Sequence, residues 1–159
     1  KGEINMTIKN AIKQYFPYAP GILRKKITPI ATCELTEREI YLLAKAYEGL
    51  ERQLLADGVS ENSLTNLNLI FTPQGNFEIV NDEPSEWASH CCFAIYYVDK
   101  LRSREDDEFI VFAYLEELVH HFYSIEDESE VKKKVLQAIN KTQYKVTEEK
   151  LKSWKLVGA

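Results

Sequence analysis

The stretch FAYLEELVHHFYSIEDESEV, residues Phe112 to Val131, carries the most informative pattern in the chain. It joins an apolar run at helical spacing to a cluster of acids, and four ionisable side chains interrupt the apolar run: Glu116, Glu117, His120 and His121. Such a polar seam is typical either of a metal-binding helix or of a buried helix whose charged side chains pair with each other. The fold and the function therefore depend on what surrounds this helix.

The helix is predicted to run from about Arg104 to Tyr123, because REDDE places carboxylates in the first turn, where the helix dipole favours them. At about 100° per residue, Glu116 and His120 fall on one line of the helix surface, and Glu117 lies beside them. Apolar side chains border that line. A carboxylate there is costly unless a charge, a metal or strong hydrogen bonds compensate it.

Two helices are predicted before the sheet. The first covers residues 4–16, from the helical spacing of its apolar side chains, and ends before a segment rich in proline. The second begins near Thr36, the expected N-cap, with Glu39 as its capping-box partner, and ends at about Gly58.

The period of the pattern then changes from helix to strand. Residues 66–81 predict a β-hairpin with its turn at 73–76, and Ser89 to Val98 predicts a third strand that is apolar on both faces. Two further helices are expected at about 126–140 and 147–154. This order predicts an α+β fold, in which N-terminal and C-terminal helices flank a small, mostly antiparallel three-stranded sheet.

Composition sets the broad class. The 159 residues, 45% hydrophobic and 28% charged, predict one domain over residues 1–159 with a Lys-rich helical extension at 141–159. Because Met6 is the only methionine, residues 1–5 are interpreted as a cloning remnant, unless the whole chain is a fragment. There is no long apolar run and no secretory leader, so we expect a cytoplasmic protein without a membrane partner. A net charge of −5 disfavours nucleic acid as a partner.

EELVHHF, residues 116–122, resembles the HExxH helix of zincin metallopeptidases, with Glu116 in the place of the first histidine. The layout is similar as well, since in small zincins a sheet whose last strand borders the cleft precedes this helix. The resemblance implies a zincin-like fold in which His120 is a zinc ligand, Glu117 is the catalytic general base and Glu116 is a substitute ligand.

The resemblance also implies a third ligand downstream of the helix. Glu126 lies six residues after His120, as in families with HxxGxxH spacing, although Tyr123 replaces their glycine. Glu128 or Glu130, on the next helix, would suit families in which a later acid completes the site. The predicted zinc ligands are therefore Glu116 and His120, completed by one of these acids, with Glu126 and Glu130 as the main candidates.

Three functions stay open at this point. The altered first ligand favours a degenerate zincin-like domain that acts as a binding or regulatory module and takes an extended peptide along the strand Ser89–Val98. The first alternative is an active zinc-dependent peptidase in which Glu117 deprotonates a zinc-bound water. The second is an interaction domain in which Glu116 and His120 form an ion pair at the rim of the core and His121 points outward. A di-iron centre is a weaker alternative, because the helix offers a single ExxH.

Overall fold

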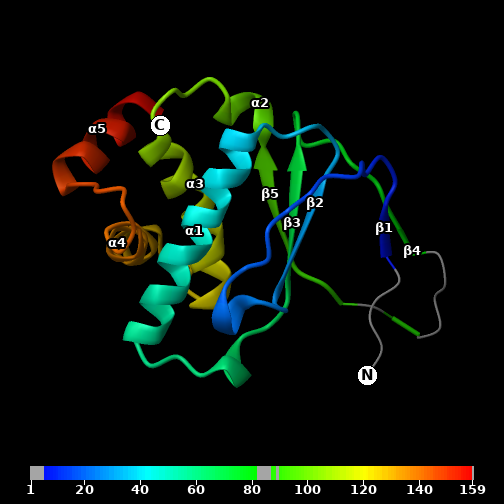
Figure 1. Ribbon diagram of the computed structural model, residues 1–159, viewed down its shortest axis with the longest axis horizontal. Coiled ribbons are helices and arrows are strands. Elements are labelled where there is room, and N and C mark those ends of the chain that lie inside the picture. The colour runs from blue at the N-terminus through cyan, green and yellow to red at the C-terminus, as the bar shows by residue number, and fades with distance from the viewer. Residues whose placement is uncertain (1–5, 82–86, 89, 159) are drawn as a thin grey trace.

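The computed structural model describes residues 6–81, 87–88 and 90–158 (Figure 1). Within them the predicted α+β class is confirmed. The main sheet is three-stranded and parallel, and its strands, in spatial order, are β2 (Ile27–Ala31), β3 (Leu67–Thr72) and β5 (Phe93–Tyr97). A separate antiparallel pair joins β1 (Met6–Ile8) to β4 (Ile79–Asn81).

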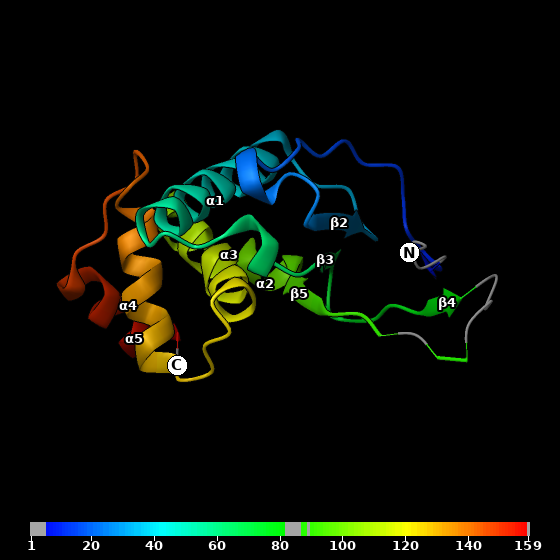
Figure 2. The same cartoon turned by 90° about the horizontal axis from the view of Figure 1, so that it is seen from below.

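The helices lie in layers on one side of the main sheet (Figure 2). α1 and α3 are next to the sheet, and α4 and α5 lie beyond them. The α-helices are α1 (Glu37–Ala56), α2 (Val98–Leu101), α3 (Asp107–Phe122), α4 (Glu128–Ile139) and α5 (Glu148–Gly158), and two short 3-10 helices are η1 (Gly21–Leu23) and η2 (Glu61–Ser63). Among the described residues, no helix is both long enough and apolar enough to cross a membrane.

The N-terminus of α1 has the predicted capping box. The backbone N–H of Glu39 donates to the Thr36 hydroxyl at 3.1 Å, and the Glu39 carboxylate accepts from the Thr36 N–H at 2.8 Å. These two bonds satisfy N–H groups that the helix itself leaves unpaired. Because both partners lie within four residues of each other, the start of α1 is fixed locally, and the predicted helix is confirmed.

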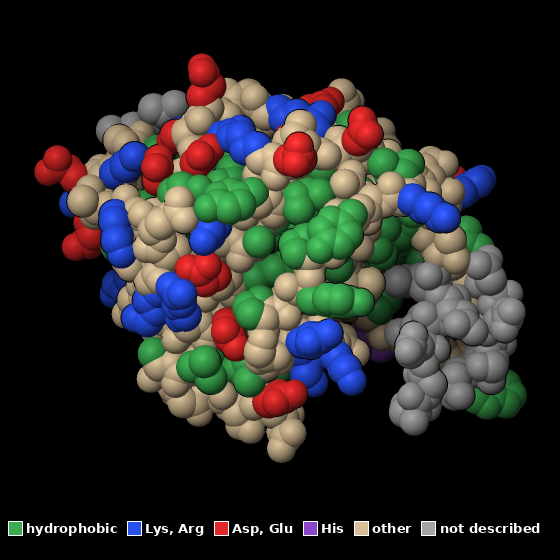
Figure 3. Space-filling view, in the orientation of Figure 1, with side chains coloured by type: hydrophobic (Ala, Val, Ile, Leu, Met, Phe, Trp, Pro, Cys, Tyr) green, Lys and Arg blue, Asp and Glu red, His purple; other side chains and the backbone are tan. Residues whose placement is uncertain are grey.

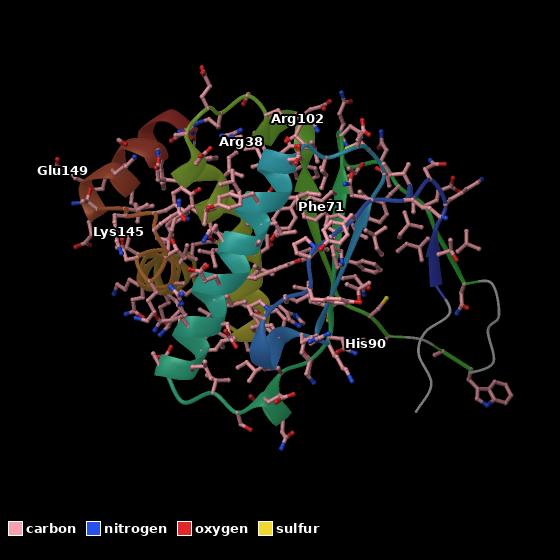
Figure 4. All side chains as sticks on the ribbon, viewed as in Figure 1. Arg38, Phe71, His90, Arg102, Lys145 and Glu149 are labelled. Atoms are coloured by element: carbon pink, nitrogen blue, oxygen red, sulfur yellow. The ribbon has the colours of Figure 1, made fainter. Side chains whose placement is uncertain are left out.

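An aromatic cluster connects the sheet to α3 and α1. Phe71 on β3 stacks on Tyr96 of β5 with 5.1 Å between ring centroids and meets the edge of Tyr114 on α3 at 6.0 Å (Figure 4). The buried hydroxyls are also satisfied, because Tyr96 donates to the Tyr114 carbonyl at 2.7 Å and Tyr114 donates to the Glu39 carbonyl at 3.3 Å. Three elements distant in sequence are therefore held by one set of rings.

The predicted first helix is wrong. Over the described part of residues 4–16, the chain forms β1, a turn at residues 9–10 and then a segment without regular secondary structure. Ile8 is buried in the strand pair with β4, and Phe16 stacks on Phe71 at 5.7 Å. Tertiary contacts therefore override a spacing that resembled a helix. Residues 1–5 lie outside the described residues.

The predicted hairpin is half confirmed. Its first strand, β3, and the bend at 73–75 are present, but the second strand, β4, pairs with β1. β3 instead lies between β2, which the pattern did not predict, and β5, which falls within the predicted third strand. The first residue of that predicted strand, Ser89, lies outside the described residues. Because α1 connects β2 to β3, these strands run parallel, so the three-stranded sheet is parallel and not antiparallel.

A partly buried ion pair fixes α2 against the start of α1. Arg102 donates to both Glu39 carboxylate oxygens, at 2.6 and 2.8 Å, and to the Glu34 carbonyl at 2.8 Å (Figure 4). Burial alone would raise the pKa of Glu39, but the bonds from Arg102 and the Thr36 backbone outweigh it and lower that pKa. The stabilisation is therefore present at neutral pH and is lost as the pH falls below about 4.

We expect Arg102→Met to reduce the free energy of unfolding at pH 7 by about 2 kcal/mol, because it leaves the buried Glu39 carboxylate without a cation. Arg38→Met is the matched control, since the Arg38–Asp107 pair has side chains 45% and 40% exposed and is expected to contribute less than about 1 kcal/mol. Urea unfolding measures both variants. Equal losses in the two would contradict the assignment.

Candidate functional site

Glu116 lies at the interface between α3 and α4. Its side chain is 27% exposed, and its carboxylate is 2.9 Å from the ammonium group of Lys132 on α4. The sequence predicts that the negative charge of Glu116 must be compensated, and in the structure Lys132 compensates it. The predicted ion pair between Glu116 and His120 is not formed, because each of these side chains has another partner.

His120 is held from two sides. Its Nδ1 is 2.8 Å from the carbonyl oxygen of Ile125, which can only accept, so Nδ1 carries a hydrogen. Its Nε2 is 3.2 Å from a carboxylate oxygen of Glu128, and Glu128 is in turn 3.7 Å from Lys132. We refer to Glu116, Lys132, Glu128 and His120 as the α3–α4 polar network.

The candidate third ligands differ in position. Glu128 contacts His120, whereas Glu126 and Glu130 are exposed and neither forms a hydrogen bond or ion pair with any described residue. In the part of the chain that the structure describes, no three His, Cys, Asp or Glu side chains are grouped so that they could hold a metal ion. Lys132 pairs with both carboxylates of the network, Glu116 and Glu128, and balances one of their two negative charges. Its ammonium group occupies the carboxylate oxygens that a zinc ion would need, so this arrangement does not fit zinc.

His121 has a structural contact that the sequence did not predict. Its Nε2 lies 3.1 Å from the hydroxyl and 3.0 Å from the carbonyl of Thr65, just before β3. The side chain is half-buried and does not point outward as expected. His121 therefore connects the end of α3 to the start of the central strand.

Glu117 is the one member of the seam without a partner. Its side chain is exposed, and no described residue forms a hydrogen bond or salt bridge with it. The surrounding protein nevertheless raises the pKa of its carboxyl by desolvation, with a contribution from Glu116, although His120 opposes the shift. Glu117 lies about one helical turn after Tyr114, whose carbonyl accepts from the Tyr96 hydroxyl of β5. The charge of Glu117 also helps to raise the pKa of Tyr96.

We expect Glu117→Gln to stabilise the protein at pH 7. Because the folded-state pKa of Glu117 is raised, wild-type stability from this group is present below about pH 4 and is lost as the pH rises through the folded-state pKa. The variant avoids that loss, so its advantage should disappear in acid. Urea unfolding between pH 4 and 8 tests this, with the contact-free Glu126→Gln as control. An advantage independent of pH would contradict it.

We expect Lys132→Met to lower the free energy of unfolding by about 1–2 kcal/mol, because the half-buried Glu116 carboxylate loses its partner. Adding Glu116→Gln should recover part of that loss. A double-mutant cycle by urea unfolding measures the coupling between the two side chains. The exposed Lys133→Met serves as the control, and additive effects of Lys132→Met and Glu116→Gln would refute the pairing.

Comparison of the chain with protein-family models, with curated proteins and with solved structures finds no match. A function must therefore be inferred from the contacts themselves. Two features stand out: a polar network in which one lysine pairs with two carboxylates, and a carboxylate without a partner among the described residues, Glu117, on the helix that bonds to the last strand of the sheet.

Proposed function

We propose that the chain is a zincin-like, non-catalytic binding module that takes an extended peptide along the outer edge of β5. The observation that carries this proposal is that β5 pairs with β3 on one side and, among the described residues, with no strand on the other. An edge strand of this kind presents a row of unpaired peptide groups to a partner chain.

The register identifies the peptide groups that are available. The N–H of Asn68 donates to the Cys92 carbonyl, and in a parallel ladder the groups that face one neighbour alternate along the strand. Ala94 and Tyr96 therefore bond to β3. The peptide groups of Phe93, Ile95 and Tyr97 face the outer edge.

The opposite edge of the sheet is protected. The N–H of Ile12 donates to the Ala31 carbonyl at 2.9 Å, so the N-terminal segment covers β2. β5 contains no charge and no proline in its sequence, FAIYY, so two of the features that usually protect an edge strand are absent from it. The difference between the two edges supports β5 as the binding strand.

The neighbouring α3 supports a binding role without catalysis. Glu117 lies on α3 one turn after Tyr114, which accepts from Tyr96 of β5, and its side chain has no hydrogen-bond or ion-pair partner among the described residues. Its carboxylate is therefore available to accept from an N–H or a cationic side chain of the peptide. Lys132 compensates Glu116, the residue that stands where a zincin has its first histidine. The order of β5 followed by the EELVH helix agrees with the zincin-like part of the proposal.

Ile95→Pro tests the edge directly. Proline at this position removes one outward N–H but no bond to β3, and Ile95→Val keeps the N–H. Octapeptides selected from a random library on the wild-type protein would be labelled and titrated by fluorescence anisotropy. We expect the proline variant to bind about tenfold more weakly, which corresponds to about 1.4 kcal/mol of binding free energy. The valine variant should bind as tightly as the wild type.

Urea unfolding of both variants separates a loss of binding from a loss of fold. Unchanged binding by a folded Ile95→Pro variant would refute the β5 edge. Metal analysis of protein purified without chelators tests the other part of the proposal. Stoichiometric zinc that is lost in both His120→Ala and Glu128→Ala would replace it with the zinc-dependent peptidase, in which Glu117 is the general base.

A further inference from the structure

Charge is strongly segregated along the chain. Residues 6–33 contain five basic side chains and no acid, whereas the whole chain carries −5, so the remaining residues carry −10. The five basic residues are Lys9, Lys13, Arg24, Lys25 and Lys26. A net charge for the whole protein therefore hides a local cationic segment.

Most of these cations are not neutralised. Lys9 pairs with Glu78 at 3.5 Å, but Lys13, Arg24 and Lys25 are exposed and form no ion pair with any described residue. Many cations in or next to the helices do have acidic partners: Arg38, Lys45, Arg52, Arg102, Lys132, Lys134 and Lys150. The N-terminal cations are thus available to an external anion.

Exposed side chains, two of them tyrosines, occur at every third residue between these cations in the sequence. Ile12, Tyr15 and Tyr18 are 42%, 78% and 79% exposed, whereas Phe16 and Ala19 pack toward the core. A three-residue repeat is that of a polyproline II helix, and Pro17 and Pro20 favour this conformation. Pro20 itself has φ −80° and ψ 157°. The exposure of Ile12, Tyr15 and Tyr18 thus agrees with an extended course of the segment.

The segment is attached firmly to the rest of the protein. Phe16 stacks on Phe71, the N–H of Ile12 donates to Ala31, and the Leu35 N–H donates to the Gln14 side chain at 2.9 Å. A partner would meet a preformed platform, which reduces the entropy lost on binding.

Arg24 connects the aromatic and basic parts of this surface. Its guanidinium carbon lies 4.9 Å from the centre of the Tyr18 ring. On the face seen in Figure 3, hydrophobic side chains gather near the crossing N-terminal segment, and Lys and Arg side chains lie beside them. We call Lys13, Tyr15, Tyr18, Arg24 and Lys25 the basic tyrosine surface.

We propose that the basic tyrosine surface binds a short acidic segment of a partner protein. Tyrosine and arginine are the side chains that contribute most to protein interfaces, and the free cations complement carboxylates. A long nucleic acid would extend past this surface onto a protein whose remaining residues carry −10, which would repel phosphates. A short peptide contacts the cationic surface alone.

This surface is independent of the β5 edge. The N-terminal segment covers the β2 side of the sheet, and β5 forms the opposite edge (Figure 2). Variants of one surface should leave binding at the other unchanged, so the failure of either proposal can be recognised separately.

The test uses the fluorescein-labelled peptide (Glu-Glu-Leu)4, its neutral counterpart (Gln-Gln-Leu)4 and a dT12 oligonucleotide, titrated by anisotropy in low salt. We expect the acidic peptide to bind most tightly and to weaken about tenfold in the triple variant Lys13→Gln/Arg24→Gln/Lys25→Gln. Tyr15→Ser/Tyr18→Ser should also weaken it, and Ile95→Pro should not.

The matched control is Lys133→Gln/Lys141→Gln/Lys152→Gln, which removes the same charge from exposed lysines on or next to the C-terminal helices. It should bind the acidic peptide within about twofold of wild type, because screening limits the effect of distant charges. Equal weakening by the two triple variants, equal binding of the neutral peptide, or no binding of the acidic peptide would overturn the proposal. Tighter binding of dT12 would assign the surface to single-stranded nucleic acid instead.

Discussion

The hydrogen bond from the Tyr96 hydroxyl to the Tyr114 carbonyl joins α3 to β5, and the position of Glu117 relative to the proposed binding strand depends on this connection. The bond is 2.7 Å long and buried, and burial raises the pKa of Tyr96, so the hydroxyl remains a donor. Tyr114 continues the connection to α1 through the Glu39 carbonyl, and Glu39 in turn pairs with Arg102. A shift of α3 would therefore displace the unpartnered Glu117 relative to β5, and it would require all of these bonds to adjust.

How much of this fold could be predicted depends on the range of the contacts that decide it. The start of α1 was predictable because its capping box lies within four residues, and the line that joins Glu116 to His120 follows from helical periodicity alone. The conformation of residues 11–20 was not predictable from local sequence. Apolar residues three and four apart fit a helix, but Phe16 packs against Phe71, more than fifty residues away, and residues 11–20 form no helix.

In the candidate site, too, local features were predictable from the sequence and contacts between helices were not. Periodicity identifies Glu116 as a carboxylate in need of compensation, but it cannot name Lys132, because that requires the angle at which α4 packs on α3. The same packing decides that Glu128 meets His120 and that Glu126 and Glu130 do not. Asp57, at the end of α1, shows that packing between helices can also shift a pKa. Hydrogen bonds from Lys134 on α4 and from Tyr123, which follows α3, lower the pKa of Asp57 to about 2.

The energetic difference between Glu116 and Glu117 bears on function. Glu116 is neutralised by Lys132 and helps to join two helices, so its presence is explained by stability. Glu117 has a raised pKa and no partner, so its charge at neutral pH makes the folded state less stable than a neutral side chain would. Side chains that reduce stability are common where binding requires them. Glu117 lies on α3 one turn after the residue that accepts from Tyr96 of β5, so a peptide bound at the proposed β5 edge would account for this cost.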